Sequence, residues 1–379
     1  MIFDLSSARS FDLSSAFDTL SPSIFCSKLK LYGFDSKSVN WFKTYMENRK
    51  QVVMIGATLS EQLTTNIGSP QGAIISTTIF IILLADISLW SESSIHSYAD
   101  DTTSSVSGYD IQELKDLCEK EAENILNYMA TNKLKANDDK TAILIIKRNQ
   151  SHGKESFQIG NEIIQETATE KLLGVTVTSD LKWEEHLKKL VAKLKFRLFT
   201  LRRLSKQLPN NLMKRVADAI FMSHVRYGLP LYCPIETDPN DPHSVCIEKL
   251  RTVFNDCLRL LTGKSRTDHE SITNMLDSLG WLSLNQMAAE TRLIEAWKVS
   301  KNQSYCLNDI LKKRHKSSYS TRSKDQDLFE RGVNDIHGSA GFVNPTARIW
   351  NKAPEDIRTA ETLTEAKRHI RKYVKTLSI

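Results

Sequence analysis

Two adjacent carboxylates, Asp100 and Asp101, are the residues of this sequence with the clearest chemical potential. They follow Tyr98-Ala99 and precede Thr102-Thr103, so residues that favour β-strands flank them on both sides. This pattern predicts a strand–acid–acid–strand hairpin that presents both carboxylates from one tight turn. Mg²⁺ prefers oxygen ligands, usually one or two carboxylates together with the phosphates of a substrate. The plain alternative is a solvated turn, because aspartate is a common turn residue.

A third acid and a glycine-bounded turn add to this pair. Asp12 lies in the short apolar stretch Phe11-Asp12-Leu13, and Phe17 follows five residues later. The segment Gly68-Ser69-Pro70-Gln71-Gly72 has glycine at both ends and a rigid proline, so its backbone can come close to a planar or charged ligand. Three carboxylates could hold two cations, and two cations can clamp the attacking and leaving oxygens of a phosphoryl displacement.

The elements that position these residues are predicted from local patterns. Ser36 to Asn48 has helical spacing and Ser36 as a plausible cap. Strands are predicted over 51–55 and 60–67, on either side of a turn that starts at Gly56. A buried helix is predicted to begin near Ala73, directly after the glycine-bounded turn.

A long amphipathic helix and two more strands follow the acidic pair. Asp110 with Glu113 three residues later forms a capping-box pattern. The apolar positions of this predicted helix are Ile111, Leu114, Leu117, Cys118, Ala122, Ile125 and Met129. Strands are predicted over 141–146 and 171–178.

From Lys182 onward, helical patterns dominate. They cover 183–205, 211–227, 244–261, 284–300 and 346–377, and the polar stretch 312–335 is typical of a linker or loop. We therefore predict an α+β fold with three regions, which are a mixed region over 1–180, a basic helical region over 181–235 and a helical C-terminal region over 236–379. Trp281 and Trp350 are expected to be core anchors of the helical part.

Charge and cysteine content narrow the class of protein. The chain of 379 residues is 40% hydrophobic and 25% charged, which is typical of a globular protein. Its net charge of +6 is uneven, because residues 182–226 carry twelve Lys or Arg and three acids. A basic helix suits a polyanion, although a solvated helix face is the commoner outcome. In this helix we expect Phe196, Leu198, Phe199 and Leu201 to lie in the core.

Two further observations exclude other classes. The six cysteines are scattered and form no CxxC pair, which argues against a zinc ribbon and favours a reducing, intracellular compartment. The most apolar run, residues 73–90, is interrupted by Ser76 and Asp86 and is short for a membrane span of ~20 apolar residues. No membrane association is therefore expected, and the nucleus or cytoplasm is the expected location.

The order of the motifs resembles the palm of reverse transcriptases, most closely those of jockey-like non-LTR retrotransposons. The matching segments are Asp12 with Ala16-Phe17-Asp18, Ser69-Pro70-Gln71-Gly72, Tyr98-Ala99-Asp100-Asp101, Asn132-Lys133-Leu134, Leu173-Gly174-Val175 and Ile349-Trp350-Asn351. Ala85 departs from the family, which commonly has Asn there, and Thr77 stands where Pro is frequent. The resemblance implies a palm with an antiparallel sheet and helices, then an α-helical thumb and a helical C-terminal region.

The resemblance also implies the site. Asp12, Asp100 and Asp101 match the catalytic acids, which hold two Mg²⁺ ions, or Mn²⁺ in their place. The implied reaction is RNA-directed DNA synthesis, in which the primer 3′-hydroxyl attacks a dNTP and pyrophosphate leaves. The positions that match the nucleotide and primer site are the Leu13 carbonyl, Phe17, Gln71, Gly72, Tyr98 and Lys140.

Individual roles follow from the same resemblance. Phe17 matches the aromatic that excludes a 2′-hydroxyl, Gln71 and Gly72 match the turn at the nucleotide and template, and Tyr98 matches the residue below the primer end. Lys140 is a candidate proton donor to pyrophosphate, and a surface lysine is an equally good interpretation. The expected partners are an RNA template, a DNA primer and a dNTP. The thumb residues expected to hold nucleic-acid backbone are Lys188, Lys189, Lys193, Lys195, Arg202 and Arg203.

The main departure from the family is at the N-terminus. Only eleven residues precede Asp12, so we expect the fingers to be absent, the strand bearing Asp12 to be an unpaired edge and the isolated chain to extend primers poorly or not at all. The expected additional partner is a fingers and endonuclease portion of the same element. The alternatives are a catalytically inactive nucleic-acid-binding remnant, and a nuclease that uses the same acids.

Overall fold

The structure is a computed structural model that describes residues 5–11, 16–70, 72–135, 141–147, 154–160, 162–233, 244–304, 307–308, 310–312, 327–330 and 341–377. The chain divides into two compact units, Met1–Leu181 and Lys182–Ile379. The first unit mixes helices with strands and the second is helical, so the predicted α+β class is confirmed. Of the helices in the described ranges, none is long and apolar enough to cross a bilayer.

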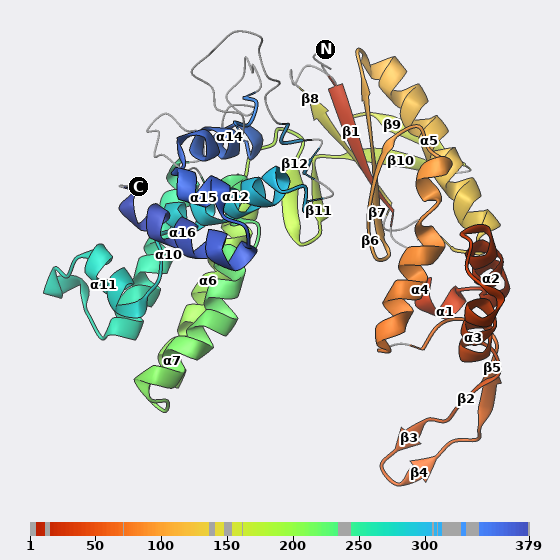
Figure 1. Ribbon diagram of the computed structural model, residues 1–379, viewed down its shortest axis with the longest axis horizontal. Coiled ribbons are helices and arrows are strands. Elements are labelled where there is room, and N and C mark those ends of the chain that lie inside the picture. Colours follow the sequence, from red (N-terminus) through yellow and green to blue (C-terminus); the bar gives the residue numbers. More distant parts are fainter. Residues whose placement is uncertain are drawn as a thin grey trace. The chain divides into compact units, whose positions relative to one another are not determined.

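A six-stranded sheet is the frame of the first unit (Figure 1). Its order is β6 (Ser94–Tyr98), β7 (Asp101–Gly108), β1 (Leu5–Phe11), β8 (Ala142–Lys147), β10 (Glu162–Thr167) and β9 (Ser156–Ile159). Only the β8–β10 pair is parallel among these neighbours. The prediction of an unpaired edge before Asp12 is wrong, because β1 pairs with β7 on one side and with β8 on the other.

One long helix, α5 (Ile111–Thr131), packs against this sheet. Leu114, Cys118 and Ala122 of α5 share a core with strand residues, namely Ile143, Ile145, Phe157 and Ile159. Asp110 caps α5 as predicted, because its Oδ1 accepts from the Glu113 N–H at 2.9 Å. The return bond of the predicted capping box is displaced by one residue, because Glu113 Oε2 accepts from the Tyr109 N–H at 2.7 Å and not from the Asp110 N–H.

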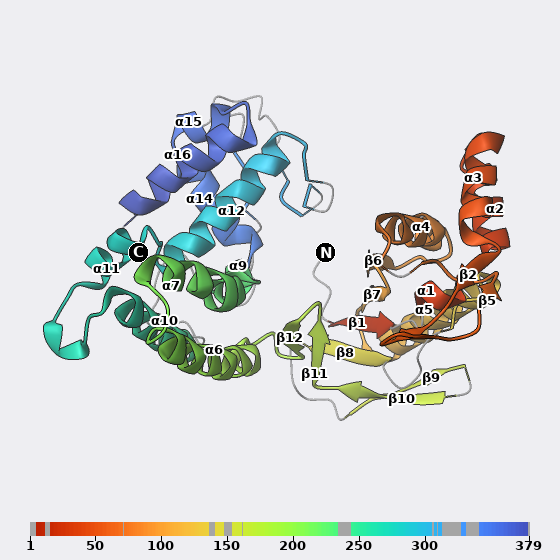
Figure 2. The same ribbon diagram turned by 90° about the horizontal axis from the view of Figure 1, so that it is seen from below.

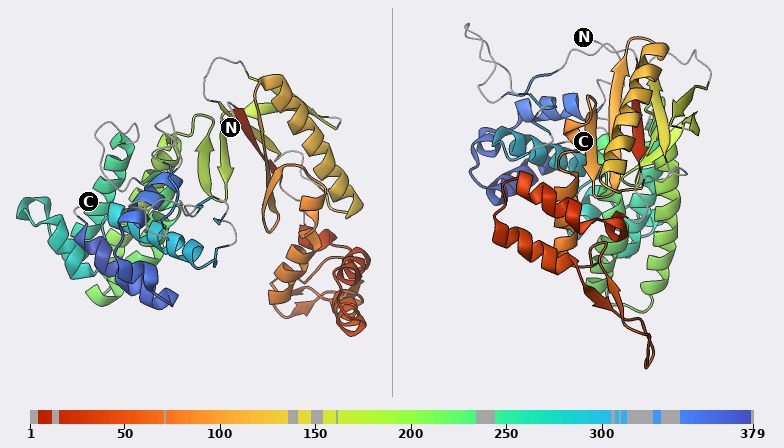
Figure 3. Two further views of the ribbon diagram at one scale, coloured as in Figure 1. Left: turned by 45° about the horizontal axis from the view of Figure 1, so that its top comes forward. Right: turned by 90° about the vertical axis from the view of Figure 1, so that its right-hand side faces the viewer.

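A second core lies where α2 (Pro22–Leu31), α3 (Ser36–Met46) and α4 (Ile74–Leu84) meet at one end of the sheet (Figure 3). The N-cap of α3 is Asp35 rather than the predicted Ser36, because the Asp35 carboxylate accepts from the Lys37 and Ser38 N–H groups. The predicted buried helix α4 buries one face only, since Ile74 at its start is 95% exposed.

A slender arm, residues 49–65, extends from the end of α3 (Figure 1). It consists of β2 (Arg49–Gln51) paired with β5 (Leu63–Thr65), and of β3 (Met54–Ile55) paired with β4 (Thr58–Leu59). The strand predicted over 51–55 is therefore broken into β2 and β3, and the strand predicted over 60–67 is reduced to β5, with β4 just before its predicted start. The predicted strand over 171–178 is also wrong, because β11 (Thr169–Leu172) and β12 (Val175–Thr178) form a hairpin that turns through Leu173 and Gly174 at positive φ.

The second unit is a set of helices around one core. Its longest members are α6 (Glu184–Leu204), α10 (Ser244–Thr262) and α12 (Leu284–Ser300), and α6 packs along α10 (Figure 2). The shorter ones are α7 (Asn210–Ala217), α8 (Ser223–Arg226), α9 (Leu229–Tyr232), α11 (Ile272–Leu279), α14 (Val343–Lys352), α15 (Glu355–Thr359) and α16 (Leu363–Thr376).

The core of the second unit includes both predicted tryptophan anchors, because Trp281 and Trp350 are buried. A π-helical turn, Asp218–Met222, interrupts the helix predicted over 211–227. The predicted boundary at residue 235 falls in 234–243, outside the described residues, and side chains from both sides of that gap contribute to the same core.

Candidate active site and nucleic-acid surface

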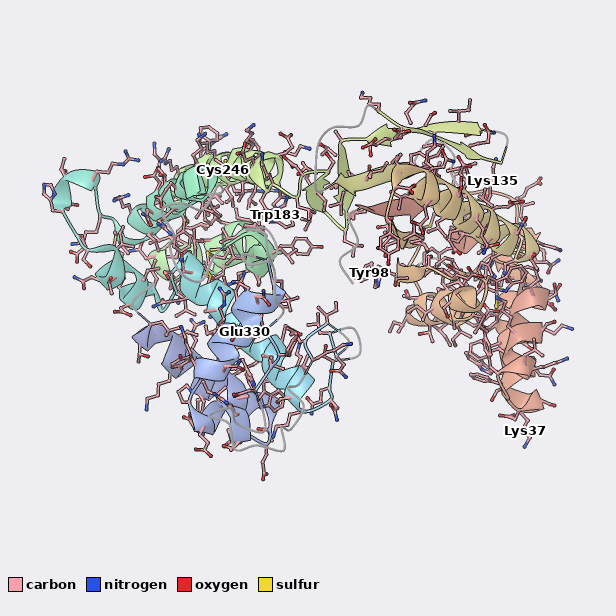
Figure 4. All side chains as sticks on the ribbon, turned by 90° about the horizontal axis from the view of Figure 1, so that it is seen from above. Lys37, Tyr98, Lys135, Trp183, Cys246 and Glu330 are labelled. Atoms are coloured by element: carbon pink, nitrogen blue, oxygen red, sulfur yellow. The ribbon has the colours of Figure 1, made fainter. Side chains whose placement is uncertain are left out.

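The acidic pair lies at the turn of the β6–β7 hairpin. Tyr98, the last residue of β6, pairs with Asp101, the first residue of β7, and Ala99 turns the chain with a φ of 53°. Asp101 is exposed and Asp100 is half-buried. Tyr98 is 70% exposed and is labelled at this end of its unit in Figure 4. The predicted hairpin is thus observed, with both carboxylates at its end.

The end of β1 lies beside this turn. Phe11 pairs with Thr102, the residue that follows Asp101. In the sequence Asp12 follows Phe11, but Asp12 and Leu13 lie outside the described residues, as do Gln71 and Lys140. The backbone register therefore brings the end of β1 to the acidic end of β7.

The donor atoms at this turn suit a hard cation. Two neighbouring carboxylates offer the oxygen ligands that Mg²⁺ prefers, so the donors present fit this ion. Within the described ranges, no group of three or more His, Cys, Asp or Glu side chains is close enough to hold a metal. The third acid expected from the sequence is Asp12, which those ranges do not include.

Phe17 and the glycine-bounded turn are held together by their backbones. The Ser69 N–H donates to the Phe17 carbonyl and the Gly68 N–H donates to the Leu20 carbonyl, both at 2.7 Å. The Phe17 ring, on the short helix α1 (Ala16–Thr19), packs against Phe80 of α4 at 5.0 Å between centroids. The structure therefore joins two motifs that are about 50 residues apart in the sequence.

The two glycines of the turn differ in their surroundings. A Cβ on Gly68 would lie 2.7 Å from the Asp18 carbonyl oxygen and 2.9 Å from the Phe17 carbonyl oxygen. A Cβ on Gly72 would have nothing within 4 Å, although its φ of +80° still favours glycine. Gly68 thus permits close packing against α1, whereas Gly72 borders open space.

A buried polar cluster among the helices of the first unit was not predicted as a site. Lys28 Nζ donates to Asp86 Oδ1 at 2.6 Å and to the Leu83 carbonyl at 2.8 Å, and the Tyr128 hydroxyl donates to Asp86 Oδ1 at 2.7 Å. Burial lowers the pKa of Lys28, against the opposing effect of Asp86. Burial, followed by the hydrogen bond to Asp86 and then the Asp86 charge, raises the pKa of Tyr128. The cluster ties α2, the end of α4 and α5 together.

The basic face of α6 presents its predicted residues to solvent. The exposed residues are Lys188, Lys189, Lys193, Lys195, Arg202 and Arg203. Leu198 and Leu201 are buried as expected, but Phe196 and Phe199 are 65% and 56% exposed, so their predicted core position is wrong. The physical reason is that α6 buries a different stripe, and the two phenyl rings fall on the opposite side.

Two features of the neighbouring helices α10 and α8 lie next to the basic residues of α6. A cavity of about 200 Å³ lies between α6 and α10. Its apolar wall includes Leu187 and Cys246, and its lysines are Lys188, Lys195 and Lys249. Figure 4 labels Trp183 at the start of α6 and Cys246 near the start of α10. On α8, partial burial and then the charges of Lys193 and Arg197 lower the pKa of His224.

Comparison with known protein families gives a match within the first unit. Residues 6–177 match the family described as "Reverse transcriptase (RNA-dependent DNA polymerase)". A comparison with curated proteins gives no match.

Solved structures that resemble the chain include apo telomerase from Candida tropicalis, with a TM-score of 0.38, 12% identity and coverage of 74% of this chain and 54% of that one. Telomerase from the same organism in complex with a TWJ fragment of telomeric RNA has a TM-score of 0.37, 13% identity and coverage of 73% and 49%. This chain thus spans about half the length of these two structures.

Proposed function

We propose that this chain, whose residues 6–177 match the reverse transcriptase family, is the palm and thumb portion of an RNA-directed DNA polymerase from a jockey-like non-LTR retrotransposon. The observation that carries the proposal is the β6–β7 hairpin, which holds Asp100 and Asp101 beside the end of β1. The catalytic centre would lie at this turn. Residues 1–180 would be the palm, 181–235 the thumb and 236–379 a helical C-terminal region.

The metal ions would be held by the carboxylates at this turn. Asp100 and Asp101 would supply oxygen ligands, and Asp12 would complete the set from the chain that follows β1, with the Leu13 carbonyl as a further ligand. Two Mg²⁺ ions, when bound, would lower the pKa of the primer 3′-hydroxyl and stabilise the charge that develops on the phosphoryl group. The contribution of the chain is to fix the acids on a paired hairpin, so that little reorganisation accompanies the reaction.

The nucleotide would lie against Phe17 and the glycine-bounded turn. Two backbone hydrogen bonds fix the turn to the Phe17 segment, and this rigidity supports a role for the phenyl ring in excluding a 2′-hydroxyl. Open space at Gly72 supports close approach of a nucleotide or template. Gln71 would contact that nucleotide, Tyr98 would pack below the primer end and Lys140 would donate a proton to pyrophosphate.

The basic face of α6 would hold the template–primer backbone. Its exposed lysines and arginines suit phosphate contacts that carry no sequence information. Phe196 and Phe199 lie exposed on the same helix, and exposed aromatic rings among cationic side chains are typical of surfaces that stack on bases. RNA, a DNA primer and a dNTP would be the partners, together with a fingers and endonuclease portion of the same element, in the nucleus or cytoplasm.

Primer extension tests this proposal. Purified chain is incubated with poly(rA)/oligo(dT), dTTP and Mg²⁺ or Mn²⁺, and products of the wild type and of Asp100→Ala are resolved on a sequencing gel. We expect slow extension at most, and none with Asp100→Ala. Extension that survives Asp100→Ala would contradict the assigned centre. Shortened primers would indicate a nuclease, and nucleic-acid binding without any metal-dependent product would indicate an inactive remnant.

A further inference from the structure

One arginine closes the base of the arm and also contacts the glycine-bounded turn. Arg49 is the first residue of β2, and its Nη2 donates to the Ile67 carbonyl at 2.7 Å and to the Gly68 carbonyl at 3.1 Å. Its Nε donates to the Met46 carbonyl at 3.1 Å. One guanidinium thus joins the end of α3 to the last residues before Ser69.

These contacts complete the fixation of Gly68. The Gly68 N–H donates to the Leu20 carbonyl at 2.7 Å, and its α-carbon packs so tightly against Asp18 that a Cβ would not fit. The Gly68 carbonyl is the remaining polar group of this residue, and Arg49 binds it. Since the Ser69 N–H donates to the Phe17 carbonyl, the arginine, the turn and the Phe17 segment form one connected unit.

The arm is connected through Arg49 to the turn and the Phe17 segment. Its base is closed by pairing of Arg49 with Thr65 and by a hydrogen bond from the Asn48 N–H to Asn66 Oδ1 at 2.8 Å. Its outer part exposes Met54 and Ile55 and lies away from the helices of the first unit (Figure 1). A change in the direction of the arm would therefore act on the Ile67 and Gly68 carbonyls through Arg49.

We propose that Arg49 is a positioning residue for the nucleotide site, because it fixes the Gly68–Gly72 turn against Phe17 and couples that turn to the arm. This inference rests on the proposed function where it concerns the nucleotide, and on geometry alone where it concerns the turn. A planar guanidinium suits this task because one group reaches three carbonyls at fixed angles.

The test compares Arg49→Ala, Arg49→Lys and the control Lys50→Ala in the full chain. Lys50 is the exposed neighbour of Arg49 on the same strand. Hydrogen exchange of the Gly68 and Ser69 amides reports the turn, and exchange of the Ser60 amide, which donates to the Val53 carbonyl, reports the arm. Equilibrium binding of labelled dTTP with Mg²⁺ and template–primer reports the nucleotide site and needs no turnover.

We expect Arg49→Ala to speed exchange at Gly68 and Ser69 about tenfold and to weaken dTTP binding by a similar factor, within the range of ordinary coupling. Arg49→Lys should recover only part of both losses, because an ammonium can donate to the Ile67 and Gly68 carbonyls but lacks the planar fork that also serves the Met46 carbonyl. Lys50→Ala should match the wild type in both measurements.

Two results would overturn the inference. One is that Arg49→Ala speeds amide exchange at Ser60 but leaves exchange at Gly68 and Ser69 unchanged, which would mean that Arg49 stabilises the arm alone. The other is a loosened turn with unchanged dTTP affinity. A wild-type chain that binds no dTTP would contradict the proposed function instead, and amide exchange would still decide whether Arg49 positions the turn.

Discussion

Gly68→Ala is the substitution for which the structure gives the clearest penalty. Gly68 has a φ of +74°, and an added Cβ would lie 2.7 Å from the Asp18 carbonyl oxygen and 2.9 Å from both the Asp18 α-carbon and the Phe17 carbonyl oxygen. All three atoms belong to the backbone, so no flexible side chain can rotate away. The α1 segment itself would have to move.

The expected cost has two parts. An L-residue in a left-handed conformation costs about 1–2 kcal/mol, and forcing extra atoms into a packed site costs typically ~1–3 kcal/mol. Gly33 separates them, because its φ of +83° is similar and an added Cβ would meet nothing within 4 Å. Gly33→Ala should therefore lose only the first part, and Gly68→Ala should be less stable than Gly33→Ala by about 1–3 kcal/mol.

Urea titration followed by hydrogen-exchange mass spectrometry measures this difference. Peptides from α2 and α4 report the free energy of unfolding of the first unit separately from the second. If Gly68→Ala falls within about 0.5 kcal/mol of Gly33→Ala, an ordinary surface-level difference, the close packing of Gly68 on Asp18 would be refuted.

Three further predictions concern the buried cluster and the surface of α6. Lys28→Met should destabilise the first unit by about 3–5 kcal/mol, because it leaves the Asp86 carboxylate without its buried cation. Affinity for a single-stranded oligonucleotide should rise about threefold from pH 7.5 to 5.5. The pKa of His224 is lowered in the free protein, and phosphates bound near Lys193 would raise it in the complex. Protonated His224 therefore favours binding at pH values below the pKa of the complex, and this gain in affinity is lost as the pH rises through that pKa. The double change Phe196→Ala with Phe199→Ala should weaken oligonucleotide binding about tenfold without altering the slope of log affinity against log salt.

Matched controls accompany these measurements. Lys30→Met, at an exposed position of α2, should leave the free energy of unfolding within about 0.5 kcal/mol of the wild type. An equal loss in Lys28→Met and Lys30→Met would contradict the stabilising role of the Lys28–Asp86–Tyr128 cluster. In His224→Gln the pH dependence of oligonucleotide affinity should disappear. If it persists, a group other than His224 causes it. Lys193→Ala should lower the salt slope by about 0.7–0.9, and a slope change in the phenylalanine variant would mean that its loss is electrostatic.

Features that depend on neighbouring residues were predictable. The acidic hairpin follows from strand-forming residues around Asp100 and Asp101, and the start of α5 follows from Asp110 with Glu113, because these contacts close within a few residues. The same local reasoning chose Ser36 over Asp35 as the cap of α3, since both types cap helices and only the geometry separates them.

Features that depend on residues distant in the sequence could not be predicted. The place of β1 between β7 and β8 is set by pairing across about 90 to 140 residues, which no local pattern contains. Phe196 and Leu198 look alike by hydrophobicity, and the helices packed on α6 decide which of them is buried. The break at Leu173 requires a non-glycine residue at positive φ, which periodicity does not indicate.

The motifs of the candidate site could be predicted from the sequence, but the contacts that hold them in place could not. The sequence indicated Phe17, the glycine-bounded turn and the acids as separate motifs. It gave no signal for Arg49 or for the close contact of Gly68 with Asp18, because both depend on peptide groups brought together by the fold.

Iron-mediated cleavage can detect a divalent ion at the β6–β7 hairpin without requiring polymerisation. Fe²⁺ with ascorbate is added to the folded chain, radicals cut the backbone near the bound ion, and mass spectrometry locates the cuts. We predict cuts at the β6–β7 turn and just after β1, which Mg²⁺ competes away and which are absent in the folded Asp100→Asn, Asp101→Asn double variant. Cuts elsewhere, or cuts that persist in that variant, would contradict a metal site at Asp100 and Asp101.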